Sequence, residues 1–113
     1  MEIIQRAVDE QTIIIALDGV LNAATADQLK QAFRQVAEAG VRTVVLDMSK
    51  VRFVDSAGLA ALIAGSKMLG GGSHCLQLAA LQPQAQMLFR LTMFDKVFSV
   101  HQDVPSALKA CQR

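Results

Sequence analysis

Several residue types are scarce or missing in this 113-residue sequence, and some of these shortages exclude a class of protein. It has no tryptophan or tyrosine, and its 2 cysteines are too few for a small domain held together by disulfides. The net charge is +1, with acidic and basic residues interspersed, which argues against nucleic acid or an anionic membrane as a partner. Aliphatic residues are plentiful instead: 52% of the chain is hydrophobic, enough for the core of one domain.

Membrane insertion and secretion are not expected either. The longest uncharged, apolar-rich stretch, from Ala57 to Ser66, is about half of the ~20 residues that a membrane-spanning helix needs. Four charged residues within the first ten positions interrupt the start of the chain, where a secretory signal would be apolar. We therefore expect a cytoplasmic protein, in a reducing compartment, that does not itself enter a membrane.

Hydrophobic periodicity predicts alternating strands and helices. Runs rich in β-branched residues predict strands, whereas apolar residues recurring at intervals of three and four predict helices. The predicted strands cover residues 2–8, 12–17, 43–48, 74–79 and 97–100. The predicted helices cover residues 26–39, 56–69 and 83–91, followed by a terminal helix that Asp103 caps, with Pro105 in its first turn.

The order strand–strand–helix–strand–helix–strand–helix–strand–helix predicts the α/β class, as a single domain over residues 1–113 with a mostly parallel sheet. If the helices lay on one face, the class would be α+β. Asp18-Gly19 is expected to end the second strand. Asn22 or Thr25 is expected to cap the first helix, and Gly40 to terminate it.

The most informative segment runs from Leu46 to Leu59, where a predicted strand leads through a polar turn into a helix. Ser56 stands where that helix begins. One interpretation is an N-terminal cap, worth ~1 kcal/mol relative to alanine. The other is a phosphoacceptor, because the free amides and dipole of a helix N-terminus favour a phosphate. The two are compatible, and a phosphate there would add ~1.5 to 2 negative charges while leaving the fold intact.

The neighbours of Ser56 also allow two interpretations. Asp55 could orient the Ser56 hydroxyl or accept its proton, or it could be the helix cap itself. Small residues recur along the same helix, and they could pack it closely on the sheet or let a partner backbone approach its exposed edge. The set is Ala57, Gly58, Ala60, Ala61, Ala64 and Gly65, of which Ala57, Ala60 and Ala61 would form that edge.

Other candidates for chemistry have ordinary structural explanations. Gly70-Gly71-Gly72 follows a predicted helix and precedes a strand, the reverse of a phosphate-binding loop. His74 and His101 have no acidic or cysteine residue at ligand spacing, so a metal site is not expected. Asp47 and Asp55 lack a histidine or metal motif that would make them acid–base catalysts. We therefore expect neither a catalytic site nor a cofactor.

The segment Val54-Asp55-Ser56-Ala57-Gly58-Leu59 resembles the STAS domain family, and specifically the bacterial anti-sigma factor antagonists. The resemblance covers nearly the whole chain. It includes the opening hairpin, the turn from Asp18 to Asn22, the strand end from Leu46 to Ser49 and the stretch from Leu91 to Phe98. It implies the family fold, a four- to five-stranded mixed sheet with about four helices, largely on one face.

The resemblance also implies a function in signal transduction. Unphosphorylated family members bind a histidine-kinase-like serine kinase that doubles as an anti-sigma factor, and so free the sigma factor for transcription. Phosphorylation of the serine that corresponds to Ser56 breaks the complex, and a metal-dependent serine phosphatase restores it. The resemblance places the phosphosite among Asp55, Ala57 and Gly58, and the partner surface at Asn22, Ala23, Thr25, Ser56, Ala57, Leu59 and Ala60.

One departure from the family pattern simplifies the assignment. Many members have a second serine or threonine after the acceptor, where this chain has Ala57, so Ser56 is the only hydroxyl in the motif. A similar motif also occurs in STAS subunits of bacterial lipid transporters, which dock on a transport ATPase. In that alternative Ser56 would be a helix cap only. The stretch from Leu91 to Phe98 fits the antagonist branch better.

Overall fold

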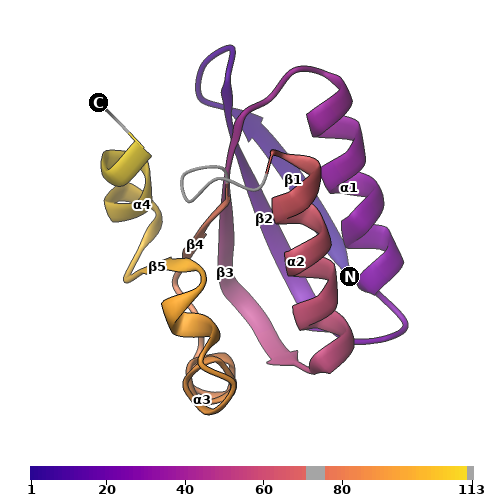
Figure 1. The fold of residues 1–113 in the computed structure, drawn as a ribbon, viewed down its shortest axis with the longest axis vertical. Helices are drawn as coiled ribbons and strands as arrows, with labels where there is room; N and C mark the ends of the chain where they lie inside the picture. Colours follow the sequence, from indigo (N-terminus) through magenta and orange to yellow (C-terminus); the bar gives the residue numbers. More distant parts are fainter. Residues whose placement is uncertain (71–75, 112–113) are drawn as a thin grey trace.

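The computed structural model describes residues 1–70 and 76–111, and its elements follow the predicted order (Figure 1). One five-stranded sheet has the strand order β1-β2-β3-β4-β5. The strands are β1 (Glu2–Ala7), β2 (Thr12–Leu21), β3 (Thr43–Val54), β4 (Leu76–Ala79) and β5 (Ser99–His101). The helices are α1 (Ala26–Glu38), α2 (Ser56–Met68), α3 (Pro83–Leu91) and α4 (Val104–Cys111), with a short 3-10 helix η1 (Phe94–Lys96).

The sheet is mixed, as expected. The opening hairpin makes β1 antiparallel to β2, and β2, β3, β4 and β5 are parallel to their neighbours. Each parallel connection passes through a helix, because a tight turn cannot join parallel strands. The α/β class is therefore confirmed.

Two strands are longer than predicted. β2 continues to Leu21, so Asp18-Gly19 does not end it: the strand passes through register shifts around these residues, and Gly19 has a φ of +137°. Such irregularities bend a strand without ending it. β3 continues to Val54, so the expected polar turn after Met48 is strand as well. The last strand begins later than predicted, at Ser99, and the first residues of the predicted strand 74–79 lie outside the described residues.

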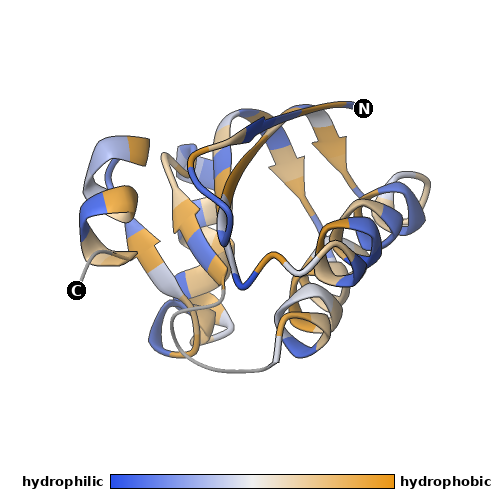
Figure 2. Ribbon diagram, turned by 90° about the horizontal axis from the view of Figure 1, so that it is seen from above, coloured by the Kyte–Doolittle hydropathy of each residue, from blue (hydrophilic) through white to orange (hydrophobic). Residues whose placement is uncertain are grey.

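The helices cover the two faces of the sheet unequally. The main core joins α1, α2 and α3 to one face, through strand residues that include Ile15, Leu46 and Leu78. A smaller core joins α4 to the other face, where Ala107 is buried with Ile14, Val45 and Ala79. Figure 2 shows the strands between α4, near the end marked C, and the pair α1 and α2. Three of the four helices thus share one face, which agrees with the expected arrangement.

The predicted stop after α1 and the predicted cap at the start of α4 are confirmed. Gly40 follows α1 with a φ of +89°, and its amide donates to the Ala37 carbonyl at 3.1 Å, which satisfies an orphan carbonyl of the last turn. Asp103 precedes α4, and its carboxylate accepts a 2.8 Å hydrogen bond from the Ser106 amide. Hydrogen bonds from Ser106 lower the pKa of the Asp103 carboxyl, although it is fully exposed.

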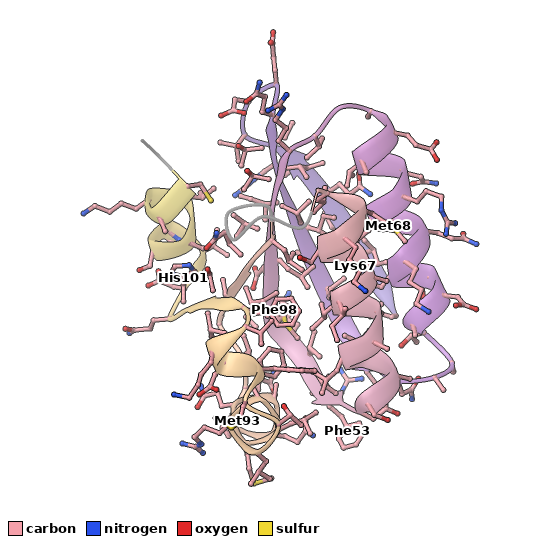
Figure 3. All side chains as sticks on the ribbon, viewed as in Figure 1. Phe53, Lys67, Met68, Met93, Phe98 and His101 are labelled. Carbon is pink, nitrogen blue, oxygen red and sulfur yellow. The ribbon has the colours of Figure 1, made fainter. Side chains whose placement is uncertain are left out.

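Phenylalanines hold the segment after α3 against the core. The rings of Phe89, Phe94 and Phe98 have centroids 6.0 to 6.5 Å apart, the edge-on or tilted geometry that aromatic pairs prefer. Phe98 points into the interior in Figure 3, whereas Met93 lies on the outside. None of the helices within residues 1–70 and 76–111 has both the length and the hydrophobicity of a membrane span.

Candidate functional site

The carboxyl ends of β2 and β3 bring two distant segments together. Leu21 pairs with Val54 at the ends of these parallel strands, and the Asp55 amide donates to the Leu21 carbonyl at 3.1 Å. Because parallel strands end at the same edge of a sheet, the turn before α1 and the start of α2 lie at one end of the molecule, the lower end in Figure 1. The predicted site residues near Asn22 and near Ser56 therefore share one edge of the sheet.

Asp55, and not Ser56, caps α2. Asp55 has extended backbone geometry, and its Oδ1 accepts a 3.0 Å hydrogen bond from the Gly58 amide. Ser56 is the first residue within the helix and is exposed. Within the part of the chain that the structure describes, no group hydrogen-bonds to the Ser56 hydroxyl. The interpretation of Ser56 as the cap is thus wrong, and the alternative that Asp55 is the cap is confirmed.

Gly58 allows the first turn of α2 to lie directly against the end of β2. A Cβ atom at this position would be 2.8 Å from both the carbonyl oxygen and Cγ of Leu21, and 3.1 Å from Cγ1 of Val54. A carbonyl oxygen within the sheet cannot easily move away, so only glycine fits here. The close approach fixes how far the first turn of α2, which carries Ser56, lies from the end of β2.

The turn from Asn22 to Thr25 is held by its own side chains. The Thr25 hydroxyl donates to the Val20 carbonyl at 2.7 Å and accepts from the Asn22 amide at 3.0 Å. The Asn22 Oδ1 accepts from the Ala24 amide at 3.0 Å. Thr25 occupies the N-cap position of α1, but its side chain makes no capping hydrogen bond, so neither predicted cap acts as one. Ala23 is exposed on this turn.

The small residues of α2 divide between the core and the surface. Gly58, Ala61 and Gly65 are buried, and a Cβ atom on Gly65 would clash with the ring of Phe33 on α1. The packing explanation therefore holds for these three. Ala61 was predicted to lie on the exposed edge of the helix, and that prediction is wrong because its side chain is buried. The exposed or partly exposed positions are Ala57, Ala60 and Ala64.

Leu59 differs from the rest of the predicted partner surface. Its side chain is only 5% exposed and belongs to the main core. It therefore packs the start of α2 onto the sheet and offers little surface to another protein. The remaining residues of the predicted partner surface are at least partly exposed: Asn22, Ala23, Thr25, Ser56, Ala57 and Ala60.

The described residues at this edge include no cluster of acid–base or metal-binding groups. Asp55 follows Asp47 by eight positions of nearly continuous strand, which is ~26 Å at the rise of an extended chain, so the two carboxylates do not work as a pair. Among residues 1–70 and 76–111, no three histidine, cysteine or acidic side chains are grouped to hold a metal. His101 contacts Gln77 at 2.6 Å, and His74 lies outside the described residues.

Sequence reasoning missed two residues at this edge. Phe53, the penultimate residue of β3, is 45% exposed, and Figure 3 shows its side chain at the lower end of the molecule. Gln84, on α3, forms two hydrogen bonds with the backbone of Val54. A pattern of charge or hydrophobicity would not identify Gln84, because its partner lies 30 positions away in the chain.

Comparisons with known proteins agree on one family. The STAS domain model matches residues 4–107. BtrV of Bordetella bronchiseptica, which bears the name of an anti-sigma factor antagonist, is 33% identical over 88 residues, 78% of this chain and 76% of BtrV. The crystal structure of an anti-sigma factor antagonist from Mycobacterium paratuberculosis superposes with a TM-score of 0.87 at 26% identity, over 99% of this chain and 94% of that one.

A more distant structure shows the same fold. The Bacillus cell fate determinant SpoIIAA, in its phosphorylated form, superposes with a TM-score of 0.74 at 16% identity. The match covers 98% of this chain and the whole of SpoIIAA. At this identity the likeness concerns the fold.

Proposed function

This chain belongs to the STAS domain family, and we propose that it is an anti-sigma factor antagonist controlled by phosphorylation of Ser56. In the unphosphorylated state it binds a serine kinase, of the histidine-kinase-like type, that also acts as an anti-sigma factor. Transfer of the terminal phosphoryl group of ATP to the Ser56 hydroxyl dissociates the complex. A metal-dependent serine phosphatase hydrolyses the ester and restores binding.

The observation that carries this proposal is that Asp55 and Ser56 have different roles at the start of α2. Asp55 supplies the cap of α2, whereas the Ser56 hydroxyl is exposed and makes no hydrogen bond to any residue within 1–70 or 76–111. A phosphate on Ser56 would therefore add ~1.5 to 2 negative charges without removing a contact of the fold. The helix N-terminus tolerates that charge, whereas the neighbouring Asp55 carboxylate increases the local negative potential.

The proposed binding surface surrounds Ser56 at the sheet edge. It comprises Asn22, Ala23 and Thr25 on the turn before α1, and Ser56, Ala57 and Ala60 on α2. Leu59 packs the start of α2 onto the sheet beneath this surface. Small side chains at Ala23, Ala57 and Ala60 leave room for close approach by a partner. A phosphate placed among them would have to be buried in the interface, and burying an unpaired charge is costly.

In this account the chain is a substrate and a ligand, and not a catalyst. The kinase and the phosphatase would supply every catalytic group, which is consistent with the wide separation of Asp47 and Asp55. The likeness to BtrV and to the Mycobacterium paratuberculosis antagonist supports the anti-sigma antagonist role.

A pull-down from a lysate of the native host tests the proposal. The baits are the wild type, Ser56→Ala, Ser56→Asp and the control Ser49→Asp, which puts the same charge on another exposed serine. Bound proteins are identified by mass spectrometry. We expect a protein with a histidine-kinase-like ATPase domain on the wild-type, Ser56→Ala and Ser49→Asp baits, and its loss from the Ser56→Asp bait.

Two results would contradict the proposal. The first is retention of the kinase by the Ser56→Asp bait together with equal binding of Ser56-phosphorylated protein. The second is capture of a transport ATPase by all four baits, which would favour a role as a transporter subunit with no regulatory use of Ser56.

A further inference from the structure

The second half of β3 lacks a strand on one side. β4 pairs with β3 only from Val44 to Asp47, although β3 continues to Val54. Beyond Asp47, the backbone groups that face away from β2 need other partners, since an unpaired buried amide or carbonyl costs about 1 to 3 kcal/mol. Two glutamines at the start of α3 supply some of them.

Gln84 satisfies both backbone groups of Val54. Its Oε1 accepts from the Val54 amide at 2.9 Å, and its Nε2 donates to the Val54 carbonyl at 2.9 Å, so the side-chain amide pairs with the strand as a neighbouring strand would. Gln82, two residues earlier, makes a single hydrogen bond from Nε2 to the Ser49 carbonyl at 2.8 Å. Both anchor α3 to β3, but only Gln84 does so next to Ser56.

The peptide groups that precede Ser56 are therefore held from two sides. Gln84 holds Val54 on the α3 side, and the Leu21 carbonyl accepts from the Asp55 amide on the β2 side. Asp55 then fixes the first turn of α2 through the Gly58 amide. Few backbone torsions therefore remain free between these hydrogen bonds and the Ser56 hydroxyl.

We propose that Gln84 is a positioning residue for the phosphoacceptor, which it holds through Val54 in the geometry that the kinase requires. This role rests on the proposed function of Ser56. Phosphoryl transfer depends on in-line placement of the attacking oxygen, and a displacement of ~1 Å can reduce a rate by about a hundredfold. Gln84 contacts neither Ser56 nor the transferred group, so it acts only through the backbone.

The test compares Gln84→Met with Gln82→Met. Methionine keeps the length and apolar packing of glutamine but cannot form either amide hydrogen bond. The readouts are the steady-state kinetics of Ser56 phosphorylation by the captured kinase with ATP, and amide hydrogen exchange of residues 53–58. For Gln84→Met we expect kcat to fall about tenfold or more with a smaller change in KM. Exchange at Val54 and Asp55 should accelerate, whereas Gln82→Met should change neither readout at these residues.

A second variant, Gln84→Glu, keeps the test usable if Gln84→Met does not fold. Gln84→Glu retains an acceptor for the Val54 amide but loses the donor to its carbonyl, so we expect an intermediate kcat. Circular dichroism at the assay temperature identifies the folded variants. If wild-type Ser56 is phosphorylated and folded Gln84→Met matches it in kcat, the positioning role is refuted and the proposed function stands. If the kinase neither binds nor phosphorylates the wild type, both are refuted.

Discussion

Asp55 and Ser56 are neighbours in the chain but have different surroundings. The Asp55 carboxylate faces the helix and accepts from the Gly58 amide, whereas Ser56 faces solvent. The sequence could not decide which of them caps α2, because aspartate and serine are about equally good caps. The answer depends on where β3 ends. That end is set by the pairing of Leu21 with Val54, and helix α1 lies between these two residues in the chain.

The stability of the two alanine variants separates these roles. We expect Asp55→Ala to lower the free energy of unfolding by about 1 kcal/mol, because the cap hydrogen bond is lost. Ser56→Ala should change it by less than about 0.5 kcal/mol, as for an ordinary surface site. Urea denaturation of both variants measures the difference. Equal losses in the two variants would mean that the Ser56 hydroxyl takes part in capping.

At the scale of elements, the sequence predicted which segments are strands and helices but not how far two strands extend. Asp18-Gly19 has the composition of a turn, yet the strand continues through it because β3 pairs with Gly19 and with the residues that follow. The sequence did not predict the second half of β3 as strand, for a related reason. Its polar residues are exposed, and its backbone is paired with β2 and with glutamines from α3.

The ends of α1 and α3 differ in a way that predicts their stability. Both are followed by a residue with positive φ: Gly40, at +89°, after α1, and Met93, at +62°, after α3. A side chain with a Cβ atom is strained in this conformation by about 1 kcal/mol, whereas glycine is not.

We therefore expect Met93→Gly to raise the free energy of unfolding by up to about 1 kcal/mol, and the matched Gly40→Ala to lower it by a similar amount. Thermal and urea denaturation check both variants. Destabilisation by Met93→Gly would show that contacts of the methionine side chain, which is 56% exposed, outweigh the backbone strain.

At the scale of the whole molecule, the candidate site depends on the fold without being part of its core. β2 and β3 bring Asn22 and Ser56 to one edge, Gly58 sets the height of α2, and α3 supports the strand end through Gln84. The motif around Ser56 and its resemblance to a family predicted the location of this edge. The contribution of α3 could not be predicted, because it depends on a side-chain contact between segments that only the folded chain brings together.

The proposed switch changes a surface and leaves the core intact. The Ser56 hydroxyl is exposed and makes no hydrogen bond to any residue within 1–70 or 76–111, so phosphorylation should affect binding far more than folding. Phosphorylated and unphosphorylated protein should therefore share one fold and differ in affinity for the kinase.

The most direct test is isothermal titration calorimetry of the purified kinase with wild-type protein, unphosphorylated or fully phosphorylated on Ser56. We predict binding of the unphosphorylated protein and an affinity at least about a hundredfold lower after phosphorylation, because an unpaired charge in an interface costs several kcal/mol. NMR amide spectra of the two forms should differ only around Ser56. Equal affinities of the two forms, with phosphorylation verified by mass spectrometry, would contradict the account.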